Sequence, residues 1–578
     1  MGSGKNRKTG KNPEPAREIG IPSMQSKRMG EVMAQQNFSY YNVTKFDTIK
    51  EMLDIAVKEA GDRIAFKYKS DGGIVEVTYA DFTRQISWLG SALTEMGFGD
   101  RHIACIGSNS YKWVLSYLTV LKSAGVFIPI DKELPPEDIF HIINESEAGI
   151  VFHTMAHEEL FMNNQDKLPN VKFFIGFDLA DDNGNFLSFD RLVEHGKNLD
   201  STQYDAMESD PNELKLLVYT SGTTGIAKGV MLSEHNLVSS VYYGLQVSTV
   251  YDSCLSVLPY HHTYESVSGI LVSLHHHATI CINDSLTAVL KNLQLFKPSY
   301  IYLVPAFVEV FYKRILKNIE ESGRKNIFAK MVSLSNGSRK IGIDLRKKLF
   351  RSIHEAFGGR LRKIVCGGAP IRPEIGKFFD DIGISLINGY GITECSPLVC
   401  ANHDQFNDYN TAGIKLPCIE WRIDSPNEEG IGEICVKGDV VMLGYYKQPE
   451  KTAEVLIDGW FFTGDYGFIN EKQQLVITGR KKNIIVLSNG KNIYPEEIEG
   501  YIQAIDYVTE VIVRGLQDEK GYESALMAEV FLSEGKNAGE VLKDIKKVLY
   551  DLPPYKQIAK VVIRELEFDK TTSKKIKR

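Results

Sequence analysis

Short apolar runs alternate with helical periodicity from about Phe38 to about residue 480. The pattern predicts a buried strand at 103–108 (I-A-C-I-G-S), an amphipathic helix at 111–122, a strand at 126–130 and a helix at 135–145. Further strands are predicted at 149–153, 173–176, 279–282, 300–304, 362–366 and 384–388. This rhythm favours an α/β fold, with layered and mostly parallel sheets covered by helices.

The pattern changes at 479–483 (G-R-K-K-N), a charged stretch between two apolar strands. Beyond it, one apolar helix face runs through Ile498–Ile505 and another through Val541–Leu549. Strands are expected at 511–513, 525–532 and 561–563. About 100 residues of α+β structure can fold alone. We therefore expect a flexible basic tail at 1–36, a large N-terminal domain at 37–480 and a small C-terminal domain at 481–578.

Composition and charge narrow the classes of function. The 578 residues are too many for one compact core, and a net charge of −7 argues against a nucleic-acid binder. No apolar run approaches the roughly 18–20 residues that cross a bilayer. The basic N-terminal residues lack an apolar core, so they are expected to form a solvated tail or a peripheral contact with an anionic membrane surface. A soluble, cytoplasmic protein is expected, either a monomer or a homodimer.

The eight cysteines are scattered, and no C-x-x-C pair occurs. Neither a zinc site nor a redox pair is therefore indicated. The histidines at 261–262 and 275–277 have no carboxylate or cysteine partners at ligand spacing, so polar or pocket roles are expected rather than a metal site.

The stretch 217–230 (L-V-Y-T-S-G-T-T-G-I-A-K-G-V) has the donors of a phosphate-binding loop. It is not a Walker A motif, because Lys228 follows Gly225 by three positions and precedes another glycine. A strand is expected at 216–219 and a helix at 233–243, capped by Ser233. Glycine allows the backbone to approach an anion, and hydroxyls, amides and the lysine donate to it. The expected phosphate ligands are Thr220, Ser221, Gly222, Thr223, Thr224, Gly225 and Lys228.

Three later stretches add nucleotide chemistry. The turn at 366–370 (C-G-G-A-P) is weak evidence alone. In 388–394 (N-G-Y-G-I-T-E), Tyr390 is expected on an exposed loop where a purine can stack, and Glu394 offers the hard oxygen that Mg²⁺ prefers. In 463–465 (T-G-D), Asp465 is expected on a turn, where it can accept hydrogen bonds from ribose hydroxyls.

Together these stretches resemble the adenylate-forming superfamily. The motifs on which this resemblance rests are 221–229 (S-G-T-T-G-I-A-K-G), 388–394, 463–465, Gly479–Arg480 and the tail 569–578 (D-K-T-T-S-K-K-I-K-R). They occur in the family's order and cover roughly residues 45–578. Three further stretches look most like long-chain fatty acyl-CoA synthetases. They are 258–265 (L-P-Y-H-H-T-Y-E), 298–306 (P-S-Y-I-Y-L-V-P-A) and 488–499 (S-N-G-K-N-I-Y-P-E-E-I-E).

The resemblance implies an enzyme that uses ATP and Mg²⁺ to join a fatty acid to coenzyme A through an acyl-adenylate. It implies that Lys575 bridges the carboxylate and the α-phosphate, that Thr393, Glu394 and Thr224 serve Mg²⁺ and phosphate, and that Asp465 and Arg480 hold the ribose. The family usually has glycine before this lysine, whereas this chain has Lys574. Further nucleotide contacts are expected at Gly368, Ala369, Asn388, Gly389, Tyr390 and Gly391.

The resemblance also places an acyl pocket and a hinge. His262 falls where these enzymes place a histidine near the acyl carboxylate, and Tyr242, Tyr243, Tyr264 and Gly368 are expected to line the apolar pocket. The small domain is expected to be mobile and to rotate at Lys482, and Gly490 would let the pantetheine arm pass. Three alternatives stay open, namely transfer to the pantetheine of a carrier protein, a nucleotide-binding relative without catalysis, and a P-loop hydrolase, which would yield ADP rather than AMP.

Overall fold

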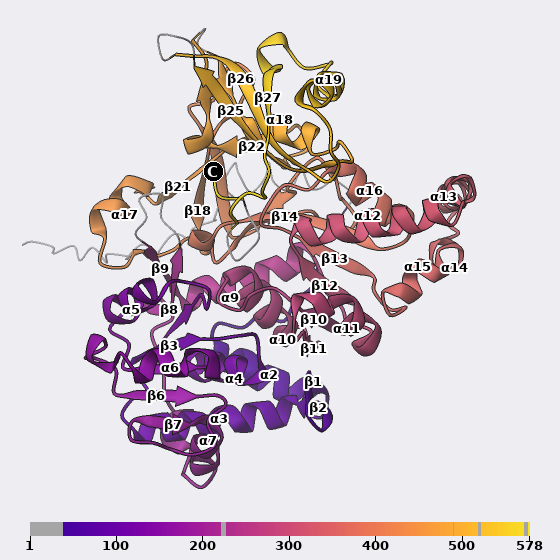
Figure 1. The fold of residues 1–578 in the computed structure, drawn as a ribbon. Helices are drawn as coiled ribbons and strands as arrows, with labels where there is room; N and C mark the ends of the chain where they lie inside the picture. The colour runs from indigo at the N-terminus through magenta and orange to yellow at the C-terminus, as the bar shows by residue number, and fades with distance from the viewer. Residues whose placement is uncertain (1–37, 221–226, 489–490, 518–521, 571–575) are drawn as a thin grey trace, which may run out of the picture. The chain divides into compact units, whose positions relative to one another are not determined.

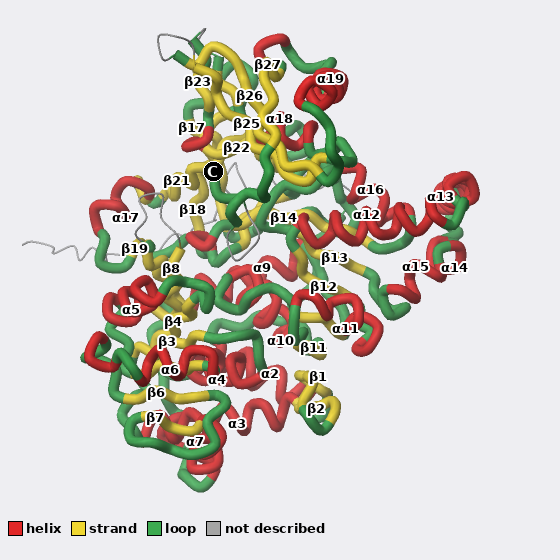
Figure 2. Tube along the Cα trace, in the orientation of Figure 1, coloured by secondary structure: helices red, strands yellow, loops and turns green. Residues whose placement is uncertain are grey.

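The computed structural model describes residues 38–220, 227–488, 491–517, 522–570 and 576–578. Residues Tyr41–Arg578 form one compact unit. Figures 1 and 2 show that this unit combines several sheets with many helices, which confirms the α/β fold class. No helix among the described residues is both long enough and apolar enough to span a bilayer.

The first large sheet has eight strands, five of whose neighbouring pairs are parallel. Its order is β19 (Gly444–Tyr445), β9 (Lys228–Ser233), β8 (Leu214–Thr220), β4 (Val126–Ile130), β3 (His102–Ile106), β5 (Ile150–His153), β6 (Phe173–Gly176) and β7 (Phe186–Ser188). The antiparallel pairs are confined to the β8–β9–β19 edge. The stretch predicted to bind phosphate begins at this edge, at the end of β8.

The second large sheet has nine strands and is again mostly parallel. Its order is β16 (Ile414–Lys415), β15 (Leu398–Ala401), β14 (Ser385–Gly391), β13 (Lys363–Cys366), β12 (Tyr300–Leu303), β10 (Ser253–Ser256), β11 (Thr279–Ile282), β1 (Ile64–Ser70) and β2 (Gly73–Thr78). The predicted mostly parallel sheets are therefore confirmed for the two large sheets.

Helices cover these sheets and separate their strands along the chain. The α-helices of this part are α2 (Ile49–Ala60), α3 (Tyr79–Glu95), α4 (Tyr111–Lys122), α5 (Pro136–Glu145), α6 (Glu158–Met162), α7 (Phe189–Lys197), α8 (Thr202–Asp205), α9 (Glu234–Val247), α10 (Val272–His275), α11 (Val289–Phe296), α12 (Pro305–Glu321), α13 (Lys325–Arg339), α14 (Arg346–Leu349), α15 (Arg351–Ala356) and α16 (Pro373–Asp381). A π-helix, η3 (Tyr264–Leu271), precedes α10. The predicted helix at 111–122 has the bounds of α4.

Buried apolar side chains on the strands pack against these helices. One core cluster joins Leu255, Ile301 and Leu386 of the nine-stranded sheet to side chains of α12 and α16. A second joins Ile128 and Val151 of the eight-stranded sheet to α5 and α6. Because burial of an aliphatic side chain is worth about 1.5–3 kcal/mol, these clusters hold the carboxyl ends of the strands in place.

The expected parallel layering does not extend to residue 480. A third sheet has five antiparallel strands, β17 (Ile419–Asp424), β18 (Gly432–Gly438), β21 (Trp460–Ile469), β20 (Leu456–Ile457) and β22 (Leu475–Arg480), with α17 (Pro449–Val455) before β20. The prediction was wrong here because no long helix separates these strands. Short turns join β20 to β21 and β21 to β22, whereas β18 and β21 pair across residues 439–459.

Residues beyond 484 form small sheets and one core cluster. They contain β23 (Ile485–Val486), β24 (Asn492–Ile493), β25 (Val508–Gln517), β26 (Glu523–Leu532), β27 (Ile558–Ile563), α18 (Pro495–Ile502) and α19 (Ala538–Val548). The cluster includes Ile498, Val511, Val530 and Ile545. Strand and helix positions predicted for this segment are therefore confirmed, and the boundary at 480/481 stays a prediction.

Candidate active site

The stretch predicted to bind phosphate lies between two antiparallel strands. Thr220 ends β8 and pairs with Lys228, the first residue of β9. Ser221, Gly222, Thr223, Thr224 and Gly225 lie outside the described residues. The sequence predicted strand, loop and helix, whereas β9 comes between the loop and α9. Helix α9 begins after Ser233 as expected, and Asn236 completes a capping box with it.

Tyr445 brings Lys228 and Glu394 together. Strand β19 pairs with β9, and this pairing sets Tyr445 opposite Val230. The Lys228 ammonium lies 4.8 Å from the centre of the Tyr445 ring. The Tyr445 hydroxyl donates to Glu394 Oε1 at 3.0 Å. Sequence reasoning missed Tyr445, because its only signal is an aromatic doublet after Gly444.

Glu394 is a half-buried carboxyl beside two cations. It lies with Thr393 in the short 3-10 turn Thr393–Cys395, and its carbonyl accepts from the Met442 amide at 2.9 Å. Desolvation raises the pKa of Glu394, while the Tyr445 hydrogen bond and the charges of Arg480 and Lys228 oppose the rise. A desolvated carboxylate of this kind gains from a nearby cation.

The donor set around Glu394 fits Mg²⁺ bound together with a phosphate. Mg²⁺ takes oxygen ligands and is usually held by one or two carboxylates plus substrate phosphates and water. Among the described residues, no group of three or more His, Cys, Asp or Glu side chains is placed to hold a metal ion. Glu394 would therefore supply one ligand, with phosphate oxygens and water completing the coordination.

Asp465 lies between Arg480 and Tyr390. It is buried in β21, opposite Arg480 of β22, and its Oδ1 lies 2.7 Å from the Arg480 guanidinium. The Tyr390 hydroxyl donates to Asp465 Oδ2 at 2.6 Å. The expected exposed loop for Tyr390 is wrong, as is the expected turn for Asp465. Both residues lie in strands, and the Tyr390 ring is buried because its hydroxyl reaches Asp465.

Glu433 and Lys481 flank this ion pair and were not predicted. Glu433 Oε1 accepts from the Gly464 amide at 3.1 Å, and Lys481 lies 2.6 Å from Glu433 Oε2. Gly464 has a φ of 70°, in the left-handed region that glycine enters without strain. Glu433 therefore holds the amide of Gly464 while Arg480 holds the side chain of Asp465. The sequence does not reveal the contact with Glu433, because Glu433 is distant in the chain.

An apolar cavity of about 100 Å³ lies next to Tyr390. Its described lining includes the predicted residues Tyr264, Gly368, Gly389, Tyr390 and Gly391. The Tyr264 hydroxyl donates to the Val365 carbonyl at 3.0 Å, which directs its ring to this lining. The rest of the lining is mostly small or apolar, from α9, η3, β12, β13 and the 397–401 segment. An apolar group fits such a lining better than a charged one.

Several other predicted residues lie apart from this cavity. Tyr242 and Tyr243 pack edge to face on α9 at 4.9 Å, and neither is among the described lining residues. His262 also lies outside the lining, and its ring centre is 4.1 Å from that of His261. Burial lowers the pKa of His261 to about 4, so this neighbour is neutral at pH 7.

Ala369 and Asn388, two expected nucleotide contacts, lie in a turn and in a strand of the nine-stranded sheet respectively. Ala369 lies exposed in the turn after β13, next to Gly368, whose φ is 85°. The Asn388 side chain donates to the Thr411 carbonyl at 3.1 Å. Asn388 is thus held by a neighbouring loop, whereas Ala369 is exposed.

The expected hinge and C-terminal residues are described in part. Lys482 lies in the exposed 3-10 turn Lys481–Asn483, directly after β22. Partial desolvation of its ammonium group and the positive charge of Arg480 both lower its pKa. Arg578 pairs with Glu499 of α18 and lies 3.6 Å from Glu496. Gly490, Lys574 and Lys575 lie outside the described residues.

Comparison with known proteins assigns the family. Residues 53–446 match the model of the AMP-binding enzyme family. The matched range contains Lys228, the cavity lining and Glu394. Members of this family use ATP, Mg²⁺ and coenzyme A, in agreement with the cosubstrates expected from the sequence.

Relatives cover most of the chain. The chain is 30% identical over 514 residues to the long-chain-fatty-acid–CoA ligase FadD15 of Mycobacterium bovis, covering 84% of this chain and 83% of that protein. It is 28% identical over 484 residues to human long-chain-fatty-acid–CoA ligase 1, covering 76% and 67%.

A solved structure shows the same fold. The anthranilate CoA ligase AuaEII, in complex with anthranoyl-AMP, superposes with a TM-score of 0.74 at 18% identity, covering 94% of this chain and 97% of that one. The family match and the coverage of the relatives agree. The chain belongs to the AMP-binding enzyme family and is an adenylate-forming ligase.

Proposed function

We propose that this enzyme activates a medium- or long-chain fatty acid with ATP and transfers the acyl group to coenzyme A. The observation that carries the proposal is the position of Tyr390. Its hydroxyl donates a hydrogen bond to Asp465, which also pairs with Arg480, and Tyr390 is one of the residues that line the apolar cavity. A nucleotide on the polar side and an acyl group on the apolar side would therefore meet beside one residue.

The first half-reaction joins two anions. A carboxylate oxygen attacks the α-phosphorus of ATP, the acyl–O–P bond forms, and the bond to the β-phosphate breaks to release pyrophosphate. Positioning and charge neutralisation must supply most of the rate enhancement, because neither reactant is a good electrophile or nucleophile without them. Bound Mg²⁺ would neutralise phosphate charge.

The residues of the chain divide this work. We assign Lys228, with the hydroxyl and glycine residues of 220–225, to the β- and γ-phosphates. We assign Glu394 and Thr393 to Mg²⁺ and phosphate, and Asp465 with Arg480 to the ribose. Tyr445 supports these assignments, since its ring contacts Lys228 and its hydroxyl fixes Glu394. Lys575 is assigned to the reacting carboxylate and α-phosphate.

The second half-reaction releases AMP. The thiolate of coenzyme A attacks the acyl carbon, the thioester bond forms, and AMP leaves with the electrons of the acyl–oxygen bond. Rotation of residues 481–578 about Lys482 would withdraw Lys575 from the reacting carboxylate and bring the turn with Gly490, past which the pantetheine arm enters, to the acyl-adenylate. The names of the relatives support the fatty acid and coenzyme A as substrates. A cytoplasmic location is part of the same proposal.

Product analysis tests the acceptor and the acid. Purified enzyme is incubated with ATP, Mg²⁺ and acids from acetate to stearate, including benzoate, and with either coenzyme A or a holo carrier protein. The proposal predicts acyl-CoA and AMP, with the highest kcat/KM for a medium or long fatty acid. Product on the carrier protein alone, or a preference for acetate or benzoate, would contradict it.

A further inference from the structure

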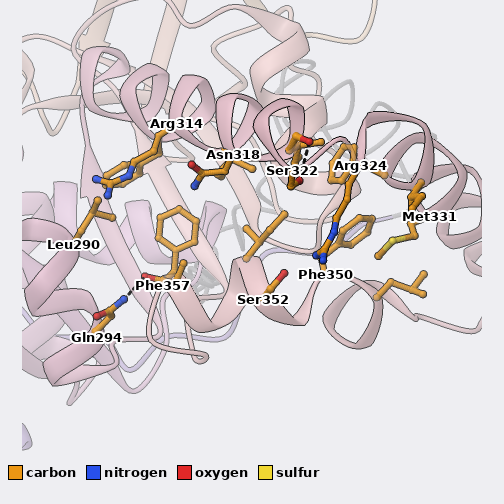
Figure 3. Close-up of a pocket in the computed structure, with 18 of the residues that line it drawn as sticks. Leu290, Gln294, Arg314, Asn318, Ser322, Arg324, Met331, Phe350, Ser352 and Phe357 are labelled. Carbon is orange, nitrogen blue, oxygen red and sulfur yellow. Dashed lines mark hydrogen bonds between the residues drawn. The ribbon is translucent and has the colours of Figure 1, made fainter.

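A second and larger cavity lies among the helices α11, α12, α13, α14 and α15. Its volume is about 640 Å³, within the range of roughly 300–1,000 Å³ that is typical of small-molecule sites. Figure 3 shows side chains from several of these helices facing the same space. The described residues that line it include none of those that line the cavity at Tyr390.

The wall of this cavity is mainly apolar. Phe311, Phe350 and Phe357 are buried members of the core cluster beneath it, and Phe328 packs against that cluster. Ile327, in the same lining, is 56% exposed. The inner wall is therefore fixed by the core, while the outer part leaves apolar surface in contact with water. Covering that surface with an apolar ligand is favourable at about 25 cal/mol per Å².

The charged lining residues are all cations. They are Lys291, Arg314 and Arg324, and the described lining contains no Asp or Glu. None of the three forms an ion pair with a described residue, although many surface cations of this chain do. In Figure 3, Arg314 lies near Leu290, whereas Arg324 lies near Phe350. Cations are thus available at separate points around an apolar space.

The charge of the surrounding segment has the same sign. Residues 305–356 contain twelve Lys or Arg and five Asp or Glu, a formal charge of +7 within a chain of net charge −7. A local excess of this size attracts anions and raises their rate of association. Apolar wall, unpaired cations and local positive charge together specify an anionic amphiphile.

We propose that this cavity binds one long acyl chain with an anionic head group, as a lipid site separate from the adenylation cavity. The acyl chain of the ligand lies against Phe311, Ile315, Ile319 and Phe328, and Arg314 or Arg324 pairs with its anionic head group. The carboxylate of a free fatty acid and the phosphates of an acyl-CoA share this chemistry. The proposal is independent of the ligase activity proposed above, because it needs no group of that site.

Photolabelling tests the location of this site. The full-length enzyme is irradiated with a diazirine analogue of palmitate, with and without excess palmitate or palmitoyl-CoA, and the adducts are mapped by mass spectrometry. We expect adducts within 311–331 and 349–357 that an excess of either competitor removes. The stronger competitor identifies the head group. Adducts confined to other segments, or adducts that neither competitor removes, would overturn the proposal.

Charge reversal tests the role of the cations. In Arg314→Glu/Arg324→Glu, palmitate labelling of these helices should require about tenfold more probe, a change of about 1.4 kcal/mol. Lys313→Glu/Lys330→Glu is the matched control, because it makes the same change of charge in the same segment at two exposed lysines outside the lining, neither of which forms an ion pair with a described residue. Its labelling should stay within about twofold of wild type. Equal weakening by both pairs would indicate nonspecific attraction and overturn the assignment.

These tests separate the two proposals. If the enzyme proves to use another acid or acceptor, labelling of α12, α13 and α15 still decides the lipid site. If labelling is absent there while acyl-CoA is formed, the lipid site is wrong and the ligase assignment stands.

Discussion

At the scale of single residues, Glu394 shows how burial and neighbouring charge determine chemistry. Desolvation raises its pKa, although Tyr445, Arg480 and Lys228 favour the carboxylate. The carboxylate is the form that can bind Mg²⁺. Because a raised pKa keeps the group protonated to higher pH, the active form is lost on the acid side earlier than for an exposed glutamate.

We therefore expect kcat/KM for ATP to fall as the pH decreases through a pKa above the ordinary glutamate value of about 4.3. Glu394→Gln should lower kcat/KM by about 10² and abolish this acid limb. Glu450→Gln, at an exposed position of α17, is the control and should retain the wild-type profile. A Glu394→Gln enzyme with a normal rate and acid limb would exclude this role.

Glu265 is a buried acid outside the proposed chemistry. Its Oε1 accepts from Ser256 at 2.5 Å, its Oε2 has no hydrogen-bond partner among the described residues, and burial raises its pKa to about 8. The folded state then binds its proton more tightly than the unfolded state does. This glutamate therefore costs stability as the pH rises from about 4.5 to about 8.

Glu265→Gln should remove that cost. The free energy of unfolding of the variant relative to wild type should increase across this pH range, by up to about 1.4 kcal/mol per pH unit. Urea denaturation of both proteins at pH 5, 6, 7 and 8 measures it. A difference that is independent of pH would show that Glu265 does not titrate in this range.

The residues that sequence analysis identified are those with a local signature. Lys228, Glu394, Asp465 and Arg480 each stand in a short recognisable stretch, and the structure brings them together around Tyr390 and Tyr445. Tyr445 and Glu433 have no such signature, because their roles arise from pairing between strands distant in the chain. The burial of Tyr390 was mispredicted for the same reason.

At the scale of elements, the short strand β19 determines the position of Tyr445. Gly444 has a φ of 143°, and a Cβ there would meet Thr452 Cγ2 at 2.8 Å. Any larger residue must therefore shift β19 or α17. Since β19 pairs with β9, such a shift would move Tyr445 away from Lys228 and Glu394.

Gly444→Ala should therefore reduce kcat/KM for ATP by about tenfold or more while leaving most of the fold intact. Gly337→Ala is the control, since α13 offers open space there and alanine favours a helix by up to about 1 kcal/mol. Steady-state kinetics and thermal unfolding of both variants measure the outcome. Unchanged kinetics in Gly444→Ala would show that β19 does not position the site.

Elements defined by an apolar pattern were predictable, and those defined by pairing were not. The helix at 111–122 and the strand at 126–130 have the predicted bounds, because a continuous apolar pattern marks both ends. Strand β9 lacks such a pattern beside the glycine-rich loop. The antiparallel sheet at 419–480 was missed because its strands alternate in burial and no long helix separates them.

At the scale of the whole molecule, the proposed reaction requires residues 481–578 to act in two half-reactions. Lys482 lies in the exposed 3-10 turn Lys481–Asn483, directly after the last strand of the antiparallel sheet. Proline fixes φ near −65° and removes an amide donor. Lys482→Pro should therefore favour one arrangement of the two parts.

The expected result is that Lys482→Pro impairs one half-reaction at least tenfold more than the other. Pyrophosphate exchange reports the first half-reaction, and conversion of supplied acyl-AMP to acyl-CoA reports the second. Lys482→Ala keeps the backbone freedom and is the control. Equal losses in both assays would speak against a rotation at this position.

The proposed function requires that a fatty acid attacks the α-phosphate of ATP in this enzyme. Exchange of labelled pyrophosphate into ATP, measured without coenzyme A and with or without palmitate, tests it most directly. We expect exchange that depends on palmitate and Mg²⁺. Exchange should be lost in Lys575→Ala, although this variant should still convert supplied palmitoyl-AMP to the thioester. Exchange that does not depend on the acid, or ADP as the nucleotide product, would contradict it.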